Sequence, residues 1–366
     1  MDPTAPDPAR SPRVSSLTGT GAVDVADVIC LGESMVTFLP SQPGRLADVP
    51  SFARAIGGAE SNAACALAAA GHRVRWVSRV GSDGFGDHLI RAIGAYGVDT
   101  STVGRDPRRP TGIYFRTATD RSTDAHEVVY YRRGSAASAM SPETVPPESL
   151  DATRVLHVSG ITAALSEDCL ALMRALTAPR AGRPLISFDV NHRPGLWRAD
   201  SGPRVLLELA RGADLVFVGD DEAETAWGLA GPEAVRAALP EPAVLVVKQG
   251  ARGATMFERP AGAGPDAGDT VTFAPAPAVD VVAPVGAGDA FAAGYLSARL
   301  RGLAPKALLR HGHLWAAATL TVPGDLTAPP GADHADRLVA LDDETWKTLR
   351  LGPGWTSAED EEVRTP

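Results

Sequence analysis

Short apolar runs alternate with longer amphipathic segments along most of this chain. Each apolar run spans four to seven residues and is rich in Val, Ile or Leu, which is typical of buried strands. These runs are Val28–Gly32, Val74–Val80, Val155–Ser159, Leu185–Asp189, Leu215–Val218 and Val244–Lys248. Helical patterns lie between them, at Ala63–Gly71, Ser166–Leu176, Pro203–Arg211, Glu222–Leu229 and Pro232–Ala238. Strands that alternate with helices predict an α/β fold, in which helices cover both faces of a mainly parallel sheet.

One region breaks this alternation and predicts a second, smaller sheet. Thr111–Ala118 and Ala125–Arg132 are β-prone runs on either side of a polar turn at Thr119–Asp124. Two such runs around a short polar turn predict a hairpin. Val36–Leu39 is a candidate for a further strand.

Composition and charge narrow the class of protein. The formal net charge of −9 argues against a nucleic-acid-binding surface. No segment approaches the ~20 apolar residues that span a bilayer, so we expect no membrane partner. Three isolated cysteines, Cys30, Cys65 and Cys169, have neither metal-site spacing nor the pattern of a secreted disulfide framework. They predict small buried side chains in a reducing, cytoplasmic environment.

The two ends of the chain have the composition of unpacked segments. Residues 1–26 are rich in Pro, Ser, Thr and Asp without an apolar stretch, and they predict a disordered tail rather than a signal peptide. Residues 354–366 are acidic and polar, and they predict a loose C-terminal tail. The intervening residues 27–353 are expected to form the folded domain.

The most informative segment is Pro284–Leu296. Gly286, Ala287 and Gly288 form a run of small residues directly before an apolar helical pattern. Backbone N–H groups that converge at a helix N-terminus favour a phosphate or another anion. Asp289 lies on the first turn, where a carboxylate could accept a proton from an attacking hydroxyl. The alternative is an ordinary capped helix after a glycine turn.

A second glycine motif lies near the other end of the chain. Gly57 and Gly58 precede the alanine-rich helical run, and Asn62 would face the same side. This motif is followed by Gly81–Gly86 and, much later, by the Gly-Ala-Gly-Asp element. In this order, the motifs resemble the two signatures of the PfkB (ribokinase-like) carbohydrate kinases. The resemblance extends from about Asp27 to Asp325.

This resemblance implies an architecture and an assembly. It implies a ribokinase-like central sheet with helices on both faces, together with a small β-sheet lid inserted at about 36–50 and 103–133. In the family such a lid covers the sugar site and often makes the dimer contact. The resemblance therefore implies a homo-oligomer that forms through the lid.

The resemblance also implies ATP and Mg²⁺ as cofactors. It implies that the amides of Gly286, Ala287 and Gly288 spread the charge of the transferred phosphoryl group, and that Asp289 is the catalytic base. Lys248, Gly250 and Gly253 resemble the family's nucleotide loop. A departure from the family pattern is Ala283, which stands where an acidic residue often helps to bind a monovalent cation, so activation by potassium is open.

Three further residues are candidates for phosphate and metal binding. Asn191 and Arg193 follow a predicted strand and could orient a phosphate or an acidic substrate. The alternative for both is a solvated turn. Glu222 resembles the glutamate of the family's Asn-x-x-Glu element, which holds hydrated Mg²⁺, although Gly219 replaces the asparagine. Its alternative is a helix-capping role.

Several blocks resemble one branch of the family, the 2-keto-3-deoxygluconate kinases. They are Thr111–Tyr114, Tyr130–Ser135, Leu156–Thr162 and Pro323–Asp325. A sugar acid needs a cation in its pocket, and Arg132 and Tyr130 stand at alternate positions of one strand, facing the same side. Arg132 could pair with the carboxylate while Tyr130 donates to it, and Asp325 would accept from a hydroxyl. The alternative for Tyr130 and Arg132 is the polar face of an edge strand. The remaining expected sugar contacts are Gly58, Asn62, Tyr114 and Arg193.

Two other functions remain open at this point. One is a fructokinase or ribokinase that acts on a neutral sugar, and the other is a sugar-binding regulator without turnover. The presence of Asp289, Gly288 and Lys248 weighs against the regulator. The sequence has no Gly-x4-Gly-Lys-Ser/Thr loop, no His-Arg-Asp triplet and no Gly-x-Ser-x-Gly elbow, which disfavours P-loop, protein-kinase and hydrolase chemistry. The preferred epimer, gluco or galacto, is also open.

Overall fold

The predicted strands assemble into one sheet of eight strands. The computed structural model describes residues 25–42, 44–117, 128–197, 201–260, 262 and 268–357. In spatial order, the strands of the large sheet are β14 (Thr270–Ala274), β13 (Ala254–Glu258), β12 (Val244–Lys248), β11 (Leu215–Gly219), β10 (Leu185–Asp189), β9 (Thr153–Ser159), β1 (Ala26–Leu31) and β4 (Val74–Val77). The six strands from β12 to β4 are parallel, and β13 and β14 are antiparallel. This confirms the α/β fold with a mainly parallel sheet.

One predicted strand is wrong in its extent. The run Val74–Val80 breaks at Ser78 into β4 and β5 (Arg79–Gly81). The second piece leaves the large sheet and pairs with β6 (Gly104–Asp106). An apolar run alone does not mark such a break, because both pieces keep a β pattern.

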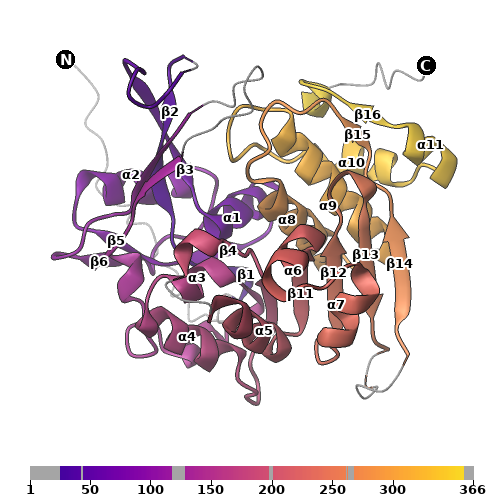
Figure 1. Ribbon diagram of the computed structural model, residues 1–366, viewed down its shortest axis with the longest axis horizontal. Helices are drawn as coiled ribbons and strands as arrows, with labels where there is room; N and C mark the ends of the chain where they lie inside the picture. Colours follow the sequence, from indigo (N-terminus) through magenta and orange to yellow (C-terminus); the bar gives the residue numbers. More distant parts are fainter. Residues whose placement is uncertain are drawn as a thin grey trace, which may run out of the picture.

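Helices cover both faces of the large sheet (Figure 1). Alternate side chains of β11 pack into different cores: Leu215 and Phe217 into one, Val216 and Val218 into the other. The first core is built with α1 (Ala59–Ala69), α2 (Gly84–Gly94), α8 (Ala287–Leu300), α9 (Pro305–Leu320), α10 (Ala332–Val339) and α11 (Asp343–Thr348). The second is built with α3 (Gly160–Ala164), α4 (Glu167–Thr177), α5 (Gly202–Gly212), α6 (Asp220–Trp227) and α7 (Pro232–Ala238).

The predicted hairpin belongs to a separate four-stranded sheet. Its strands are, in order, β3 (Phe52–Gly57), β2 (Met35–Pro40), β7 (Ile113–Arg116) and β8 (Val128–Tyr131). β7 and β8 are antiparallel and place Tyr114 opposite Tyr130, which confirms the hairpin. Its predicted turn lies outside the described residues. β3 was not predicted, since its alanines and arginine give a weak strand pattern. Figure 1 shows this sheet beside α2, at the opposite end of the molecule from β14.

The ends of the folded part differ from the predicted tails. Residues 1–24 and 358–366 lie outside the described residues, but Ala26, placed in the N-terminal tail by the sequence, is the buried first residue of β1. Trp355–Ser357, placed in the C-terminal tail, form a 3₁₀ turn. The cysteines are all free and buried. None of the helices described here has the length and apolar character of a membrane span.

Candidate active site

A cavity of about 770 Å³ lies between the small sheet and the carboxyl ends of the parallel strands. Most of the candidate residues from the sequence line it: Gly58, Asn62, Tyr114, Tyr130, Arg132, Asn191, Arg193, Glu222, Lys248, Gly286, Ala287, Gly288, Asp289 and Asp325. They come from segments that are far apart in the sequence. Their convergence agrees with the rule that sites in open α/β sheets lie beyond the carboxyl ends of strands.

Asp289 lies on the first turn of α8, as predicted, and two amides hold its carboxylate. Asn62 Nδ2 donates to one oxygen at 3.0 Å, and Asn191 Nδ2 lies 3.5 Å from the other. Burial raises the pKa of Asp289 to about 6, the nearby charge of Asp189 adds to the rise, and the Asn62 hydrogen bond opposes it. Asn191 has a φ of 41°, which among the described residues is the one positive φ outside glycine. Such strain is typical of functional sites.

If Asp289 is a catalytic base, its pKa predicts an acid limb in the pH profile of turnover. A base must be ionised before it can accept a proton, so kcat/KM should rise with pH and level off above about pH 6. An initial-rate profile from about pH 4.5 to about 8.5 in buffers of constant ionic strength measures this limb. A profile that is flat through the region around pH 6 would contradict the assignment.

The glycine that caps α8, Gly286, is required by close packing, whereas Gly288 in the first turn has more room. Gly286 has a φ of 76°, and a Cβ atom there would lie 2.2 Å from the carbonyl oxygen of Asp325. A Cβ atom at Gly288 would lie 3.4 Å from Lys248 Nζ. The first N–H groups of a helix have no partner within the helix. At α8 these groups are on the cavity wall, in a position to bind an anion.

Two ion pairs flank the start of α8. Lys248 Nζ, at the end of β12, lies 3.0 and 3.1 Å from the two oxygens of Asp189, at the end of β10. Burial acts to lower the pKa of Lys248, but the charges of Asp189, Glu222 and Asp289 together outweigh it, so the net pKa is raised and the side chain stays cationic. Arg193 pairs with Glu222 at 3.3 Å. The other oxygen of Glu222 accepts from the Gly219 amide at 2.9 Å, so Glu222 also caps α6.

A second cavity, of about 1040 Å³, continues from the first. Gly250 and Gly253 line it, with φ values of 57° and 137°. The two cavities share Arg193, Pro194, Glu222, Lys248, Pro284, Ala287 and Gly288 in their walls. The N-terminus of α8 therefore stands where two compartments meet, and Asp289, which follows the shared Gly288, faces the first of them. This arrangement suits the transfer of a group between two bound molecules.

Comparison with known proteins assigns this architecture to a family. The family model described as "pfkB family carbohydrate kinase" matches residues 25–331. This chain belongs to the pfkB family. The match confirms the resemblance seen in the sequence.

Several individual relatives of this pfkB chain are similar over most of their length. The 2-dehydro-3-deoxygluconokinase of Bacillus subtilis is 35% identical over 309 residues, 83% of this chain and 92% of its own. That of Thermoproteus tenax is 32% identical over 316 residues, 85% of this chain and 94% of its own. The probable fructokinase-3 of Arabidopsis thaliana is 29% identical over 321 residues, 83% of this chain and 88% of its own.

Solved structures show the same fold. The PfkB protein from Polaromonas sp. JS666 is 33% identical, with a TM-score of 0.72 over 86% of this chain and 100% of its own. A putative ribokinase II from E. coli, solved with ATP and Mg²⁺, is 24% identical, with a TM-score of 0.74 over 86% of this chain and 98% of its own. The ribokinase-like fold predicted from the sequence is thus confirmed.

In this pfkB chain Arg132 is less available than the sequence suggested. It follows the last residue of β8, and Glu33 holds it through contacts of 2.7 Å at Nε and 2.5 Å at Nη2. The Ser135 hydroxyl donates to the same carboxylate at 2.5 Å. Arg132 and Tyr130 do line one cavity, and the guanidinium carbon lies 5.8 Å from the centre of the Tyr130 ring. The sequence did not identify Glu33 as a site residue, because its partner Arg132 is 99 positions away.

Arg116 is a second residue that sequence reasoning missed. Tyr114 Oη donates to Asp325 at 2.5 Å, and Arg116 Nη2 lies 2.7 Å from the other oxygen of that carboxylate. Arg116 Nη2 also donates to the Pro323 carbonyl at 3.1 Å. Arg116 stands two positions after Tyr114, so the period-two alternation of a strand could have placed it on the same face. These contacts tie β7 of the small sheet to the segment beside Gly286.

Gly58 and Asn62 also have protein partners. A Cβ atom at Gly58 would lie 2.3 Å from the Glu33 carbonyl oxygen and 2.8 Å from Ser34 Cα. The glycine is therefore required where the start of α1 packs on the loop after β1. Because the amide of Asn62 donates to Asp289, its direct structural role is to orient the candidate base.

Glu60 is a buried acid that the site does not use directly. One oxygen accepts from the Ser159 amide at 3.1 Å, the Ser159 hydroxyl at 2.8 Å and the Thr162 hydroxyl at 2.9 Å. The other has no hydrogen-bond partner among the described residues. Burial raises the pKa of Glu60 to about 7, against the effect of these hydrogen bonds. The folded state therefore binds this proton more tightly than the unfolded state does.

This buried acid predicts a pH-dependent stability. A folded-state pKa above the unfolded value of 4.5 means that the contribution of Glu60 to stability is lost as pH rises towards about 7. Glu60→Gln keeps the accepting oxygen but cannot ionise. The melting temperature of the variant, relative to wild type, should therefore increase from about pH 5 to about pH 8. Parallel curves for the two proteins would contradict this.

Proposed function

We propose that this chain is an ATP-dependent 2-dehydro-3-deoxygluconokinase, which phosphorylates the terminal hydroxyl of the sugar acid also called 2-keto-3-deoxygluconate. The observation that carries the proposal is the position of Asp289 in the first cavity, held by two amides and directly after Ala287 and Gly288, which line both cavities. The names of the relatives at 35% and 32% identity support this substrate.

The second cavity suits ATP. Its apolar walls can take a base, and Lys248, Gly288 and Ala287 stand at the end it shares with the first cavity, where the phosphates would reach Asp289. The E. coli neighbour with ATP and Mg²⁺ supports nucleotide binding by this fold. In such an orientation the γ-phosphoryl group would lie against the start of α8, where helix N–H groups favour its charge.

The residues fit a metal ion that is held mainly by the nucleotide. The described residues contain no group of three or more His, Cys, Asp or Glu side chains that could hold a metal. Glu222 has both oxygens in contacts with protein, so it would reach Mg²⁺ through water. The ion would supply charge neutralisation on the phosphates.

The first cavity suits a sugar acid. Arg132 and Tyr130 are on its wall and can meet a carboxylate, while Asp325 can accept from a hydroxyl. The amides of Asn62 and Asn191 keep the carboxylate of Asp289 aimed at the remaining space. Because Arg132 already pairs with Glu33, its charge does not exclude a neutral sugar. The fructokinase alternative is disfavoured by the lower identity of 29% to the probable fructokinase.

The reaction then follows from these positions. The terminal hydroxyl oxygen of the sugar forms a bond to the γ-phosphorus as the bond from that phosphorus to the oxygen kept by ADP breaks. Asp289 takes the hydroxyl proton late in the step, and the first amides of α8 spread the charge on the phosphoryl oxygens. The protein thus contributes mainly position and electrostatics.

The small sheet offers a surface for a second copy of the chain. Val128, Val129, Tyr130 and Tyr131 of β8 are exposed by 37%, 38%, 50% and 62%. An edge strand with exposed apolar and aromatic side chains favours pairing with another chain. We propose a homo-oligomer formed through this sheet.

We also propose a cytoplasmic location for the protein, because its free cysteines fit a reducing compartment.

The identity of the product tests the proposed function. Purified full-length protein is incubated with ATP, Mg²⁺ and 2-keto-3-deoxygluconate, and the products are analysed by phosphorus NMR. We expect ADP and a single phosphomonoester coupled to the protons of the terminal carbon. Formation of ADP without a sugar phosphate, or a phosphate on another carbon, would refute the proposal.

A further inference from the structure

The C-terminal segment forms part of the wall of the second cavity. Ala276–Val279 line this cavity. β15 (Ala278–Val279) pairs in parallel with β16 (Arg350–Leu351), and the Asp280 amide donates to the Leu351 carbonyl at 2.9 Å. Trp346 Nε1 donates to the Pro275 carbonyl at 2.7 Å. The segment from α11 to β16 therefore holds this wall in place, and it lies beyond residue 331, where the match to the family ends.

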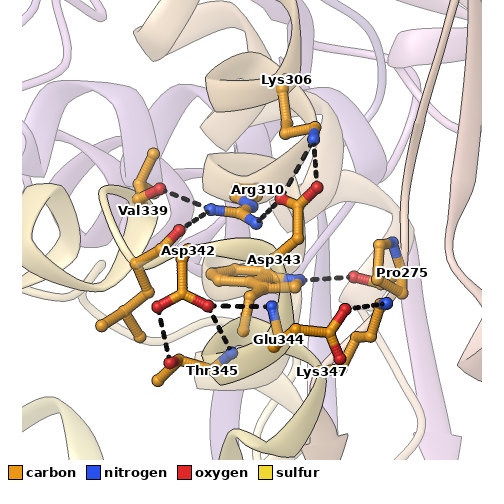
Figure 2. Close-up of polar contacts among 11 residues, drawn as sticks. Pro275, Lys306, Arg310, Val339, Asp342, Asp343, Glu344, Thr345 and Lys347 are labelled. Atoms are coloured by element: carbon orange, nitrogen blue, oxygen red, sulfur yellow. Dashed lines mark hydrogen bonds and ion pairs between the residues drawn. The ribbon is translucent and has the colours of Figure 1, made fainter.

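A buried arginine anchors α11. The side chain of Arg310, from α9, is 4% exposed and lies over the Trp346 ring, with its guanidinium carbon 4.6 Å from the ring centre. It donates to the Val339 and Leu341 carbonyls and to Asp343, as Figure 2 shows in part. Charge-assisted contacts of a buried arginine leave little freedom for the helix. The backbone of α11 is therefore held in place, and with it the positions from which its side chains reach the cavity.

Lys347 follows Trp346 and lines the second cavity. Among the described residues of this wall, the other permanent cations are Lys248 and Arg193, which pair with Asp189 and Glu222. Lys347 pairs with Glu344 at 2.7 Å, but their side chains are 53% and 85% exposed. Such an exposed pair on one helix is weak and can be exchanged for a ligand.

We propose that Lys347 binds the base and ribose end of the nucleotide, as part of a nucleotide site completed by the C-terminal segment. The assignment rests on the proposed ATP site. Lys347 belongs to the second cavity alone, whereas the shared residues Lys248 and Gly288 mark the phosphate end. Apolar side chains such as Val279, Phe291 and Leu320 form the remaining surface for the base. The ammonium group of Lys347 can donate to ring nitrogens of a purine or to ribose oxygens.

Binding measurements with two ligands test this role. Full-length wild type, Lys347→Met and Lys306→Met are titrated calorimetrically with ADP and with tripolyphosphate, which lacks base and ribose. Lys306 is the matched control, because it also pairs with an acid of α11, Asp343, at 2.8 Å but does not line the cavity. We expect Lys347→Met to weaken ADP binding by roughly three- to tenfold, between the effects of an exposed ion pair and of a charge-assisted hydrogen bond.

The two ligands separate the outcomes. Tripolyphosphate should bind equally to all three proteins, and ADP should bind equally to wild type and Lys306→Met. Unchanged ADP binding by Lys347→Met, or an equal loss for ADP and tripolyphosphate, would overturn the assignment while leaving the kinase proposal intact. Failure of the wild type to bind ADP would instead refute the proposed ATP site.

Discussion

Replacing Asp289 with asparagine should lower kcat by roughly 10²–10⁴, the usual contribution of a positioned acid or base. The asparagine keeps the shape of the side chain and can still accept from Asn62, but it cannot take the proton of the sugar hydroxyl. ADP binding should persist, because Lys248, Gly250 and Gly253 remain in place. Initial rates and calorimetric titration with ADP measure both effects.

The fold of this variant is not expected to suffer. Burial raises the pKa of Asp289, so its ionised form is less favoured in the folded protein than in water. A neutral asparagine avoids that cost, and the variant should melt no lower than wild type at about pH 8. Turnover close to that of wild type in a variant with a normal melting curve would remove Asp289 from the mechanism.

Loss of Arg132 should change the choice of substrate. If Arg132 binds the substrate carboxylate, its removal should lower kcat/KM for 2-keto-3-deoxygluconate by roughly 10- to 150-fold, since a hydrogen bond to a charged group contributes about 1.5–3 kcal/mol. Fructose has no carboxylate and should be affected much less. Parallel measurements of kcat/KM for both sugars give the comparison.

Replacing Arg132 alone is a poor test, because it would leave the carboxylate of Glu33 buried without its partner. Glu33 is 1% exposed, and breaking a buried ion pair costs about 3–5 kcal/mol. The double variant Glu33→Gln, Arg132→Met removes both charges, and Glu33→Gln alone is the matched control that keeps the cation. Equal damage to both sugars in the double variant would reject the carboxylate role. Arg116→Met is expected to harm both sugars, because Arg116 holds Asp325.

The strands and much of the cavity wall could be predicted from the sequence, because both depend on patterns that are local in the chain. Apolar runs such as Val244–Lys248 are buried on both faces in a parallel sheet, so the pattern is local and strong. Asn191 and Glu222 come shortly after such strands and Lys248 is the last residue of one, and the carboxyl ends of parallel strands meet at one edge. Their convergence on one cavity therefore follows from their positions after the strands.

Partners of these residues could not be predicted in the same way. The pairs Arg132–Glu33 and Lys248–Asp189 join segments 99 and 59 positions apart, and only the folded chain decides which charges meet. The same holds for Trp346 and Pro275, which join the C-terminal segment to the second cavity. The start of β1 was missed for a different reason. Ala26 follows residues with the composition of a disordered tail, so the sequence placed it in the tail although it is the first residue of the strand.

The central claim is that Asp289 and the two cavities serve phosphoryl transfer from ATP to a sugar acid. Its most direct test is a side-by-side measurement of kcat/KM for 2-keto-3-deoxygluconate and fructose with wild-type protein, at saturating ATP and Mg²⁺, by coupled detection of ADP. We predict a kcat/KM for the sugar acid that exceeds the value for fructose by roughly tenfold or more, the least expected from one charge-assisted contact. A kcat/KM for fructose equal to or above that for the sugar acid would contradict the account.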